Sequence, residues 1–491
     1  MSASSAGPEP RPGRFARFAR IAAFELRALA ADLTLAVLAL LFLGVLGLAA
    51  ANGARFAEAR ARTVGEIVAQ AEADLAQGRA EVAAIESGRA PAPSPFADPR
   101  SPWRVRVPAV LPPHPLAALA IGQSDLLPYA ASINLFTVKH ALFANYEVEN
   151  PLQLLSGRFD LGFALLFLFP LLILAFSYDV LAGERERGTL ALSLAQPVSL
   201  GTLVLAKFAA RAALVVGLGV GVSFGSLALR GAFAEGALAG HGGRLALWAA
   251  VIASYGLFWL ALALGVNAFG RSPAGNATAL FGLWIVLALV VPSLLSAAVE
   301  RREDAPSRMA FVAASRQAEN ATQKEGEKLL AKYYFDHPEL SGEPDPTDFS
   351  ARYYAVRLDL ERRLLPLARD FDQALLSERR ALARFRLLSP TVVAHDALLD
   401  LAGTGYVRHG RYVAQVEGWV DRWRSRFAPG LFRREPLRGG DLATLPRFAF
   451  VEEDHDALVR RSLGALGSIL GPTLLLGVLG IVALRRFRVV A

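Results

Sequence analysis

The stretch LGFALLFLFPLLILAFSYDVLAGERERGTLALSL, residues 161–194, decides the fold. Its first half, 161–178, carries no charged side chain, and a run of about 20 apolar residues is long enough to cross a bilayer as a helix. Its second half abruptly carries acidic and basic residues. The sequence therefore predicts a membrane-spanning helix that leaves the bilayer into a charged connection.

Five further runs have the same character. The first of them, at about 19 residues, exceeds the usual apolar core of about 7–15 residues in a signal peptide, so we interpret it as a span. The chain has a mean hydropathy of +0.36 and 20% charged residues. These features predict an all-α membrane protein with six transmembrane helices, an N-terminal interfacial helix and two large, mostly helical extracytoplasmic loops. The five runs are 33–51, 208–229, 245–269, 278–299 and 463–484.

Arginine and lysine near the ends of the spans predict the orientation, because short cytoplasmic loops are enriched in both. Thirteen lie in the N-terminal segment, in and just beyond the connection after the second span, in the connection after the fourth span, and in the tail, against Arg230 and Arg244 in the one short loop on the other side. Both termini are therefore predicted to be cytoplasmic. Because the basic excess of +8 lies in spans, short connections and tails, it indicates topology and no nucleic-acid partner.

This orientation predicts eight consecutive parts. They are a cytoplasmic amphipathic helix (1–32), the first span (33–51), a first extracytoplasmic domain (52–160), the second span (161–178), a cytoplasmic coupling helix (179–207), spans three to five (208–299), a second extracytoplasmic domain (300–461), and the sixth span with a cytoplasmic tail (462–491).

The long loops carry helical patterns of their own. Residues 64–85 place apolar side chains at three- and four-residue spacing, which fits either an outward continuation of the first span or a helix packed on its own domain. Residues 91–115 are rich in proline and are predicted to be an irregular linker. Two amphipathic stretches, 316–334 and 351–388, predict a pair of long helices separated by a turn at 341–347.

The composition excludes several kinds of chemistry. There is no cysteine, so disulfides, thiolate metal sites and cysteine nucleophiles are excluded. No lysine is followed by serine or threonine, which excludes a Walker-type phosphate loop. The seven histidines are scattered, and none is predicted to be a metal ligand. We therefore expect no catalytic residue, metal site or cofactor in this chain.

The connection after the second span is the most specific segment. Charged residues from Glu184 to Arg187 precede a Gly188-Thr189 pair and a short apolar helix that ends before Pro197. A short helix lying parallel to the membrane with carboxylates beside its start suits a soluble partner. The simpler interpretation is an interfacial turn between two spans, with the carboxylates serving only as a helix cap.

This segment resembles the signature of ABC-2 type permeases, the membrane subunits of ATP-driven exporters. In that family a Glu-x-Glu-x-Gly-Thr-Leu stretch follows the second span and precedes a Gln-Pro-Val-Ser-like turn and a lysine. Segments 149–152 and 157–160 are similar to the long-looped branch with extracytoplasmic domains of unknown function. The specific match covers about 120–215. The matching residues are Glu184, Glu186, Gly188, Thr189, Leu190, Gln196, Pro197, Ser199 and Lys207.

The resemblance implies a coupling site for a separate ABC ATPase subunit. The segment from Gly183 to Leu194 would form the first contact and the connection at 270–274 the second. ATP and Mg would be bound by two copies of the partner, and a second permease chain, identical or related, would complete the assembly within membrane lipid. The site residues implied are Gly183, Glu184, Arg185, Glu186, Gly188, Thr189, Leu190, Arg271 and Ser272.

Two functions follow from the resemblance. One is export of an amphipathic substrate, coupled to ATP hydrolysis in the partner. The alternative is a non-transporting mechanotransmission subunit, whose outer domains act on a periplasmic partner. Copper translocation, a role associated with some relatives, is disfavoured because copper(I) prefers Met and Cys ligands and Met309 is the single internal example.

Overall fold

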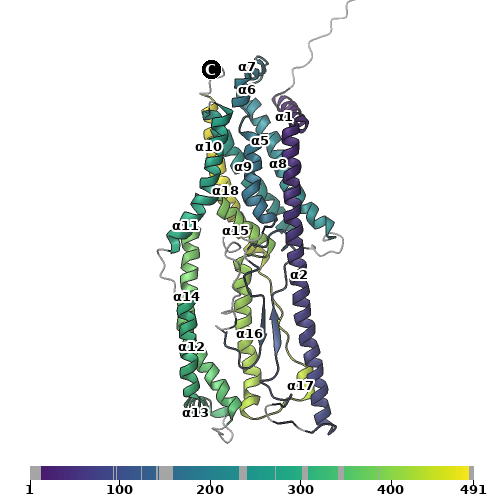
Figure 1. Cartoon of the computed structure of the whole chain (residues 1–491), viewed down its shortest axis with the longest axis vertical. Helices are drawn as coiled ribbons and strands as arrows, with labels where there is room; N and C mark the ends of the chain where they lie inside the picture. Colours follow the sequence, from purple (N-terminus) through teal and green to yellow (C-terminus); the bar gives the residue numbers. More distant parts are fainter. Residues whose placement is uncertain are drawn as a thin grey trace, which may run out of the picture.

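The protein is elongated, with an apolar helical bundle at one end and a loop-rich half at the other (Figure 1). Helices α1 (Arg14–Ala31), α6 (Ala182–Glu186) and α7 (Thr189–Leu194) lie at the bundle end, together with the end of α18 (His455–Leu484). The computed structural model describes residues 13–91, 93–94, 97–122, 124–139, 142, 159–231, 240–270, 272–300, 308–340, 348–385 and 388–485.

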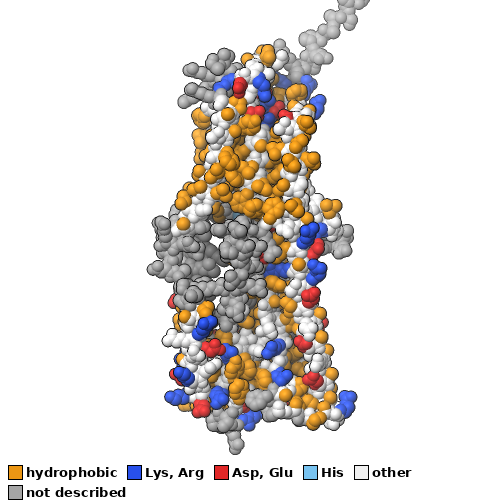
Figure 2. Space-filling model, viewed as in Figure 1, with side chains coloured by type: hydrophobic (Ala, Val, Ile, Leu, Met, Phe, Trp, Pro, Cys, Tyr) orange, Lys and Arg blue, Asp and Glu red, His pale blue; other side chains and the backbone are white. Residues whose placement is uncertain are grey.

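Six helical stretches in the described residues are long and apolar enough to cross a membrane. Each overlaps one of the apolar runs, so the predicted all-α membrane fold with six spans is confirmed. On the face shown in Figure 2, hydrophobic side chains cover this half, whereas charged side chains gather beyond it. The stretches are α2 (Leu33–Glu86), Leu161–Glu186, α8 (Leu200–Leu229), α9 (Gly242–Phe269), Pro273–Leu295 and α18.

Two of the spans are built from several segments, and both contain proline. The second consists of α4 (Leu161–Phe163), η2 (Ala164–Leu168), α5 (Phe169–Ser177) and α6, and the fifth of α10 (Pro273–Ile285), η3 (Val286–Val290) and α11 (Val291–Glu300). The elements η2 and η3 are π-helical turns that end two residues before Pro170 and Pro292, respectively. Because a proline ring clashes with the carbonyl four residues earlier, a widened turn lets the helix continue.

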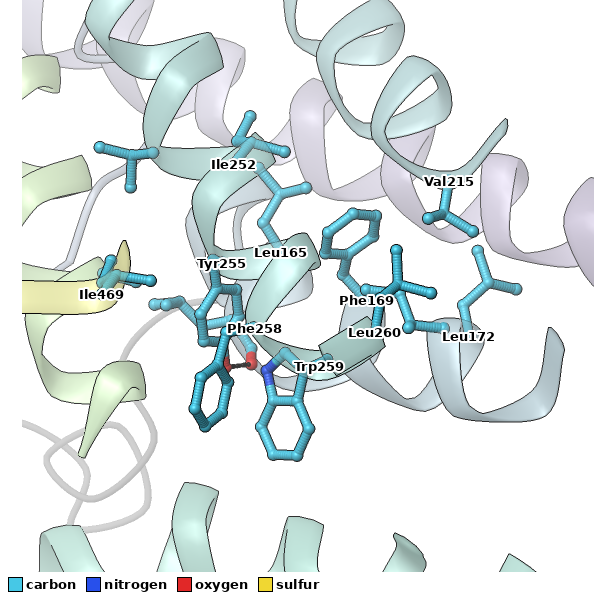
Figure 3. Packing of buried hydrophobic residues seen from close by; sticks show 14 of the residues in the cluster. Leu165, Phe169, Leu172, Val215, Ile252, Tyr255, Phe258, Trp259, Leu260 and Ile469 are labelled. Carbon is cyan, nitrogen blue, oxygen red and sulfur yellow. Dashed lines mark hydrogen bonds between the residues drawn. The ribbon is translucent and has the colours of Figure 1, made fainter. Parts of the chain in front are cut away.

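The carbonyl displaced by Pro170 has a new partner. Tyr255 on α9 donates its hydroxyl to the carbonyl of Leu166 at 2.8 Å and also lies 3.1 Å from the hydroxyl of Thr391. Figure 3 shows Tyr255 among the aromatic and aliphatic side chains of the bundle core, which include Phe169 and Trp259. A buried polar group without a partner is costly in an apolar medium, so this contact stabilises the broken span.

Helix α2 joins the two halves of the molecule. It has 54 residues, which at 1.5 Å per residue corresponds to a rod of about 80 Å. Beyond the apolar run it still buries Val64 and Val82 and contacts strand β1 (Val107–Val110) and α17 (Gly439–Ala443). Both interpretations of 64–85 therefore hold together, because the helix continues the first span and packs on its own domain.

The loop-rich half has a separate apolar core around α16 (Tyr406–Phe432). Strands β1 (Val107–Val110) and β2 (Ala130–Ile133) pair antiparallel, with Val107 opposite Ile133. The predicted irregular linker was therefore wrong at 107–110. The alternation of Val107 and Ala109, both buried, is too short to stand out among neighbouring prolines.

The second long loop forms a helical hairpin. Its first arm is divided into α12 (Arg308–Lys324) and α13 (Gly326–Asp336), followed by η4 (Pro338–Leu340), and its second arm is α14 (Phe349–Phe385). The prediction of one helix over 316–334 missed the break at Glu325. A Cβ at Gly326 would lie 3.3 Å from the Arg352 side chain, so this glycine permits close contact between the arms. The predicted turn at 341–347 lies outside the described residues.

Helix α15 (Pro390–Ala402) closes the loop-facing end of the bundle. It packs on α9 and α18 and belongs to the same apolar core as the spans. Ser389 caps its first turn by accepting the amide of Val392. Segment 116–122 also joins this core, where Asp160 accepts the amides of Ile121 and Gly122 at 2.6 and 3.2 Å. The two loops thus share one interface with the spans.

Candidate coupling site

The charged segment after the apolar run 161–178 forms two short helices, α6 and α7, separated by a sharp break. Gly188 lies between them with φ of +73°, a left-handed conformation that glycine adopts at little cost. Thr189 donates its hydroxyl to the carbonyl of Glu184 across the break, at 3.2 Å. Ser199 then caps α8 by accepting the amide of Thr202. The Gly-Thr pair therefore encodes the bend that lays α7 across the end of the bundle.

Two buried asparagines hold the start of this segment. Asn267, near the end of α9, accepts the amide of Leu181 at 3.2 Å and donates to the carbonyl of Ser177 at 2.8 Å. Asn276 on α10 donates to the carbonyl of Tyr178 at 3.0 Å. Both side chains are almost fully inaccessible. The turn between α5 and α6 is therefore tied to two other spans.

A buried ionic cluster holds the rest of α6. The ammonium of Lys207 on α8 lies 2.8 Å from Glu184 and 2.9 Å from Glu25 on α1, and Arg211 lies 2.6 Å from Glu25. Arg211 also donates to the carbonyl of Phe176 at 2.6 Å. The two acids and two bases balance in charge, as buried charges require. Helices α1, α6 and α8 thus meet at one electrostatic junction.

Glu25 keeps its negative charge in this junction. Its burial favours the neutral acid, but the nearby charges of Arg211 and Lys207 and their hydrogen bonds outweigh burial and hold the pKa of Glu25 below its usual value. One carboxylate oxygen of Glu184 holds Lys207, and the other is buried without a hydrogen-bond partner among the described residues. The carboxylate of Glu184 therefore faces the interior of the protein.

The opposite face of the segment is open to solvent. Glu186, Gly188 and Thr189 are exposed, and Leu192 exposes 73% of its surface. Arg17 on α1 donates to the carbonyl of Pro197 at 2.5 Å, which joins the end of the segment to α1. The segment therefore combines a fixed inner face with an accessible outer face.

The predicted site residues divide between these faces. Gly183 and Leu190 are buried, Glu184 and Arg185 are half-buried, and Glu186, Gly188 and Thr189 are exposed. Ser272 is exposed and caps α10 by accepting the amide of Gly275. Arg271 lies outside the described residues.

The sequence interpretation missed Glu25 and the inward direction of Arg211. The side chain of Arg211 lies near one end of its span and is long enough to reach the membrane interface, but it is only 6% exposed and lies within the cluster. A signal was present for Glu25, since it lies between Ala22 and Leu29 on the apolar stripe of an otherwise basic helix. A single acid on such a stripe indicates a buried basic partner.

Comparisons with known proteins match parts of the chain to a described family and to curated relatives. Residues 308–451 match a family described as a domain of unknown function, DUF3526. The chain is 36% identical over 140 residues to a probable ABC transporter permease protein, NosY, of Stutzerimonas stutzeri, which is 27% of this chain and 48% of the relative. The NosY of Pseudomonas aeruginosa is 33% identical over 129 residues, 25% of this chain and 46% of the relative.

This chain therefore spans about half the length of the curated relatives that it matches. Together with the six apolar helices, these similarities support an ABC transporter permease.

Proposed function

We propose that the protein is the membrane-spanning subunit of an ATP-driven ABC transporter, of the ABC-2 type. It would couple ATP hydrolysis in a separate partner chain to the export of an amphipathic substrate. Two ATPase copies and a second permease chain would complete the assembly in a bacterial inner membrane, with both termini cytoplasmic and the loop-rich half on the other side.

The observation that carries this proposal is the attachment of the segment 182–194. A displacement of α6 acts directly on α1 and α8 through Glu25 and Lys207, and on α9 and α10 through Asn267 and Asn276. A partner that docks on the exposed face could therefore move several spans at once. Rigid packing transmits such a displacement because protein interiors are nearly as dense as crystals.

The two glutamates are assigned different roles. Glu186 is exposed and available to a partner, whereas Glu184 is held by Lys207. E186Q should therefore leave the subunit as stable as the parent but weaken its association with the ATPase. E184Q should destabilise the subunit first, because it leaves the charge of Lys207 less compensated.

The test uses the natural absence of cysteine. A single Leu192→Cys variant would carry a photocrosslinker in membranes that contain the complete transporter. We expect a crosslink to a chain that also reacts with 8-azido-ATP. Phe335→Cys, at an equally exposed position (85%) in the loop-rich half, is the matched control and should give none. Labelling of an ATP-binding chain from Phe335, and none from Leu192, would refute the docking surface.

Transport itself needs a second measurement. Inside-out vesicles with the complete transporter should accumulate an amphipathic substrate when ATP is supplied, and E186Q should reduce accumulation together with ATPase association. If ATP hydrolysis is coupled to the subunit but no tested amphipathic compound accumulates, the proposal of export fails while the permease assignment stands.

A further inference from the structure

A pocket of about 520 Å³ lies in the loop-rich half, beside the start of α14. This end of α14 is far from α6 and α7 (Figure 1), so the proposed coupling does not use it. Its size falls within the usual range of small-molecule sites, about 300–1,000 Å³. The lining combines four aromatic rings, three arginines and two small polar side chains: Trp103, Arg104, Arg106, Asn134, Phe136, Phe349, Ser350, Tyr353 and Arg357.

The aromatic side chains form a continuous wall. Trp103 stacks on Phe136 with ring centroids 6.0 Å apart, and Phe136 meets the face of Tyr353 edge-on at 4.8 Å. Tyr353 in turn stacks on Phe349 at 5.9 Å. Offset and edge-to-face contacts of this kind hold rings rigidly. The wall thus offers preformed flat surfaces to a ligand.

The arginines line the pocket with three guanidinium groups, one of which, Arg357, is already paired with Glu319. Arg357 is fixed by the hydroxyl of Tyr353, 3.0 Å from its Nε, and by Glu319, 3.2 Å from its Nη1. Arg104 lies over the ring of Trp103 at 5.9 Å, and Arg106 is exposed beside it. The described lining residues include no carboxylate. Arginine binds carboxylate and phosphate groups through paired hydrogen bonds.

Asp348, the described acid immediately before α14, is already engaged. Asp348 accepts the amides of Ser350 and Ala351 at 2.9 and 3.1 Å. Its second oxygen lies 3.3 Å from Arg434. Asp348 therefore neutralises the start of α14 and Arg434 rather than the three arginines of the pocket.

We propose that this pocket binds a ring-bearing organic anion. The ring would lie against the wall formed by Trp103, Phe136 and Tyr353, and the carboxylate or phosphate would face Arg104, Arg106 and Arg357. This combination of flat apolar and cationic surfaces suits either an aromatic acid or a sugar ring that carries an acidic group. The proposal is independent of what the transporter moves.

The experiment measures binding to the full-length protein in detergent by saturation-transfer NMR. Phenyl phosphate and glucose 6-phosphate test the two kinds of ring, and benzyl alcohol tests the ring alone. Inorganic phosphate, which has no carbon-bound proton to observe, tests the anion alone through its ability to displace the ring-bearing phosphates. We expect saturable binding of at least one of the two ring-bearing phosphates, at least tenfold tighter than either partial probe. The tighter of the two identifies the ring.

Substitutions locate the site. R106Q, at an exposed position, should weaken binding about tenfold, since a hydrogen bond to a charged group contributes about 1.5–3 kcal/mol. R357Q should weaken it by at least as much. R369Q is the matched control, because Arg369 is an exposed arginine on the same helix and does not line the pocket. Equal binding by the parent, R106Q and R357Q, or no preference for the ring-bearing phosphates over benzyl alcohol, would overturn the proposal.

Discussion

The ammonium of Lys207 lies 2.8 Å from the carboxylate of Glu184, 23 residues earlier in the chain, and 2.9 Å from Glu25, 182 residues earlier. One lysine on a membrane-spanning helix therefore joins the charged segment after the second span to the N-terminal helix. Because all three side chains are largely buried, their charges depend on each other.

Removing one charge from this cluster should destabilise the protein. Breaking a buried ion pair from one side costs about 3–5 kcal/mol, because the remaining charge stays buried and unpaired. We expect E25Q and K207M each to lower the melting temperature clearly in detergent. The free energy of unfolding lost in the double variant should be smaller than the sum of the two single losses by about 0.5–3 kcal/mol. E186Q, at an exposed position, is the control, and an equal loss in E186Q would contradict the role of the cluster.

Gly270 is required for the approach of Asn276. A Cβ at Gly270 would lie 1.6 Å from the side-chain oxygen of Asn276, so alanine there must displace the asparagine from Tyr178. We expect G270A to destabilise the protein by about 1–3 kcal/mol. G265A, five residues earlier on α9 where a Cβ meets no atom within 4 Å, is the matched control. Thermal unfolding of both variants checks this, and equal stability would refute the clash.

The hydroxyl of Tyr255 compensates the helix break at Pro170. Y255F should cost about 0.5–1.5 kcal/mol for each hydrogen bond lost. In a P170A background the carbonyl of Leu166 can regain a backbone partner, so the same substitution should cost less. A double-mutant cycle on unfolding measures this coupling. Additive effects would show that the tyrosine acts independently of the proline.

His114 should make stability depend on pH. Burial, together with the charges of Arg244, Arg408 and His241, lowers the pKa of His114 to about 2, whereas in the unfolded chain it is about 6.5. Below pH 6.5 the unfolded chain therefore binds a proton that the folded protein does not, and stability falls as pH falls. Melting temperatures from pH 7.5 to 5 should decrease, and H114Q should show a smaller slope whatever its absolute stability. An unchanged slope in H114Q would assign the dependence to other groups.

The apolar runs determined the fold class and the six spans without any tertiary information. A bilayer requires about 20 apolar residues in a helix, and a helix satisfies its own backbone within the segment. The connection at 179–207 was also visible locally, because its Gly-Thr break and its caps involve residues close in the chain. The two short strands and the break at Glu325 could not be predicted in this way, since packing against other segments of the chain decides them.

The tertiary structure alone decided which charges are internal. A sequence motif does not distinguish Glu184, held by Lys207, from exposed Glu186 two residues away. Likewise, the side chain of Arg211 could have reached the membrane interface. It instead pairs inside the protein with Glu25, 186 residues earlier in the chain. The physical reason is that a helix end presents its charges in several directions, and burial by distant helices selects which of them must be paired inside the protein and which stay free for a partner.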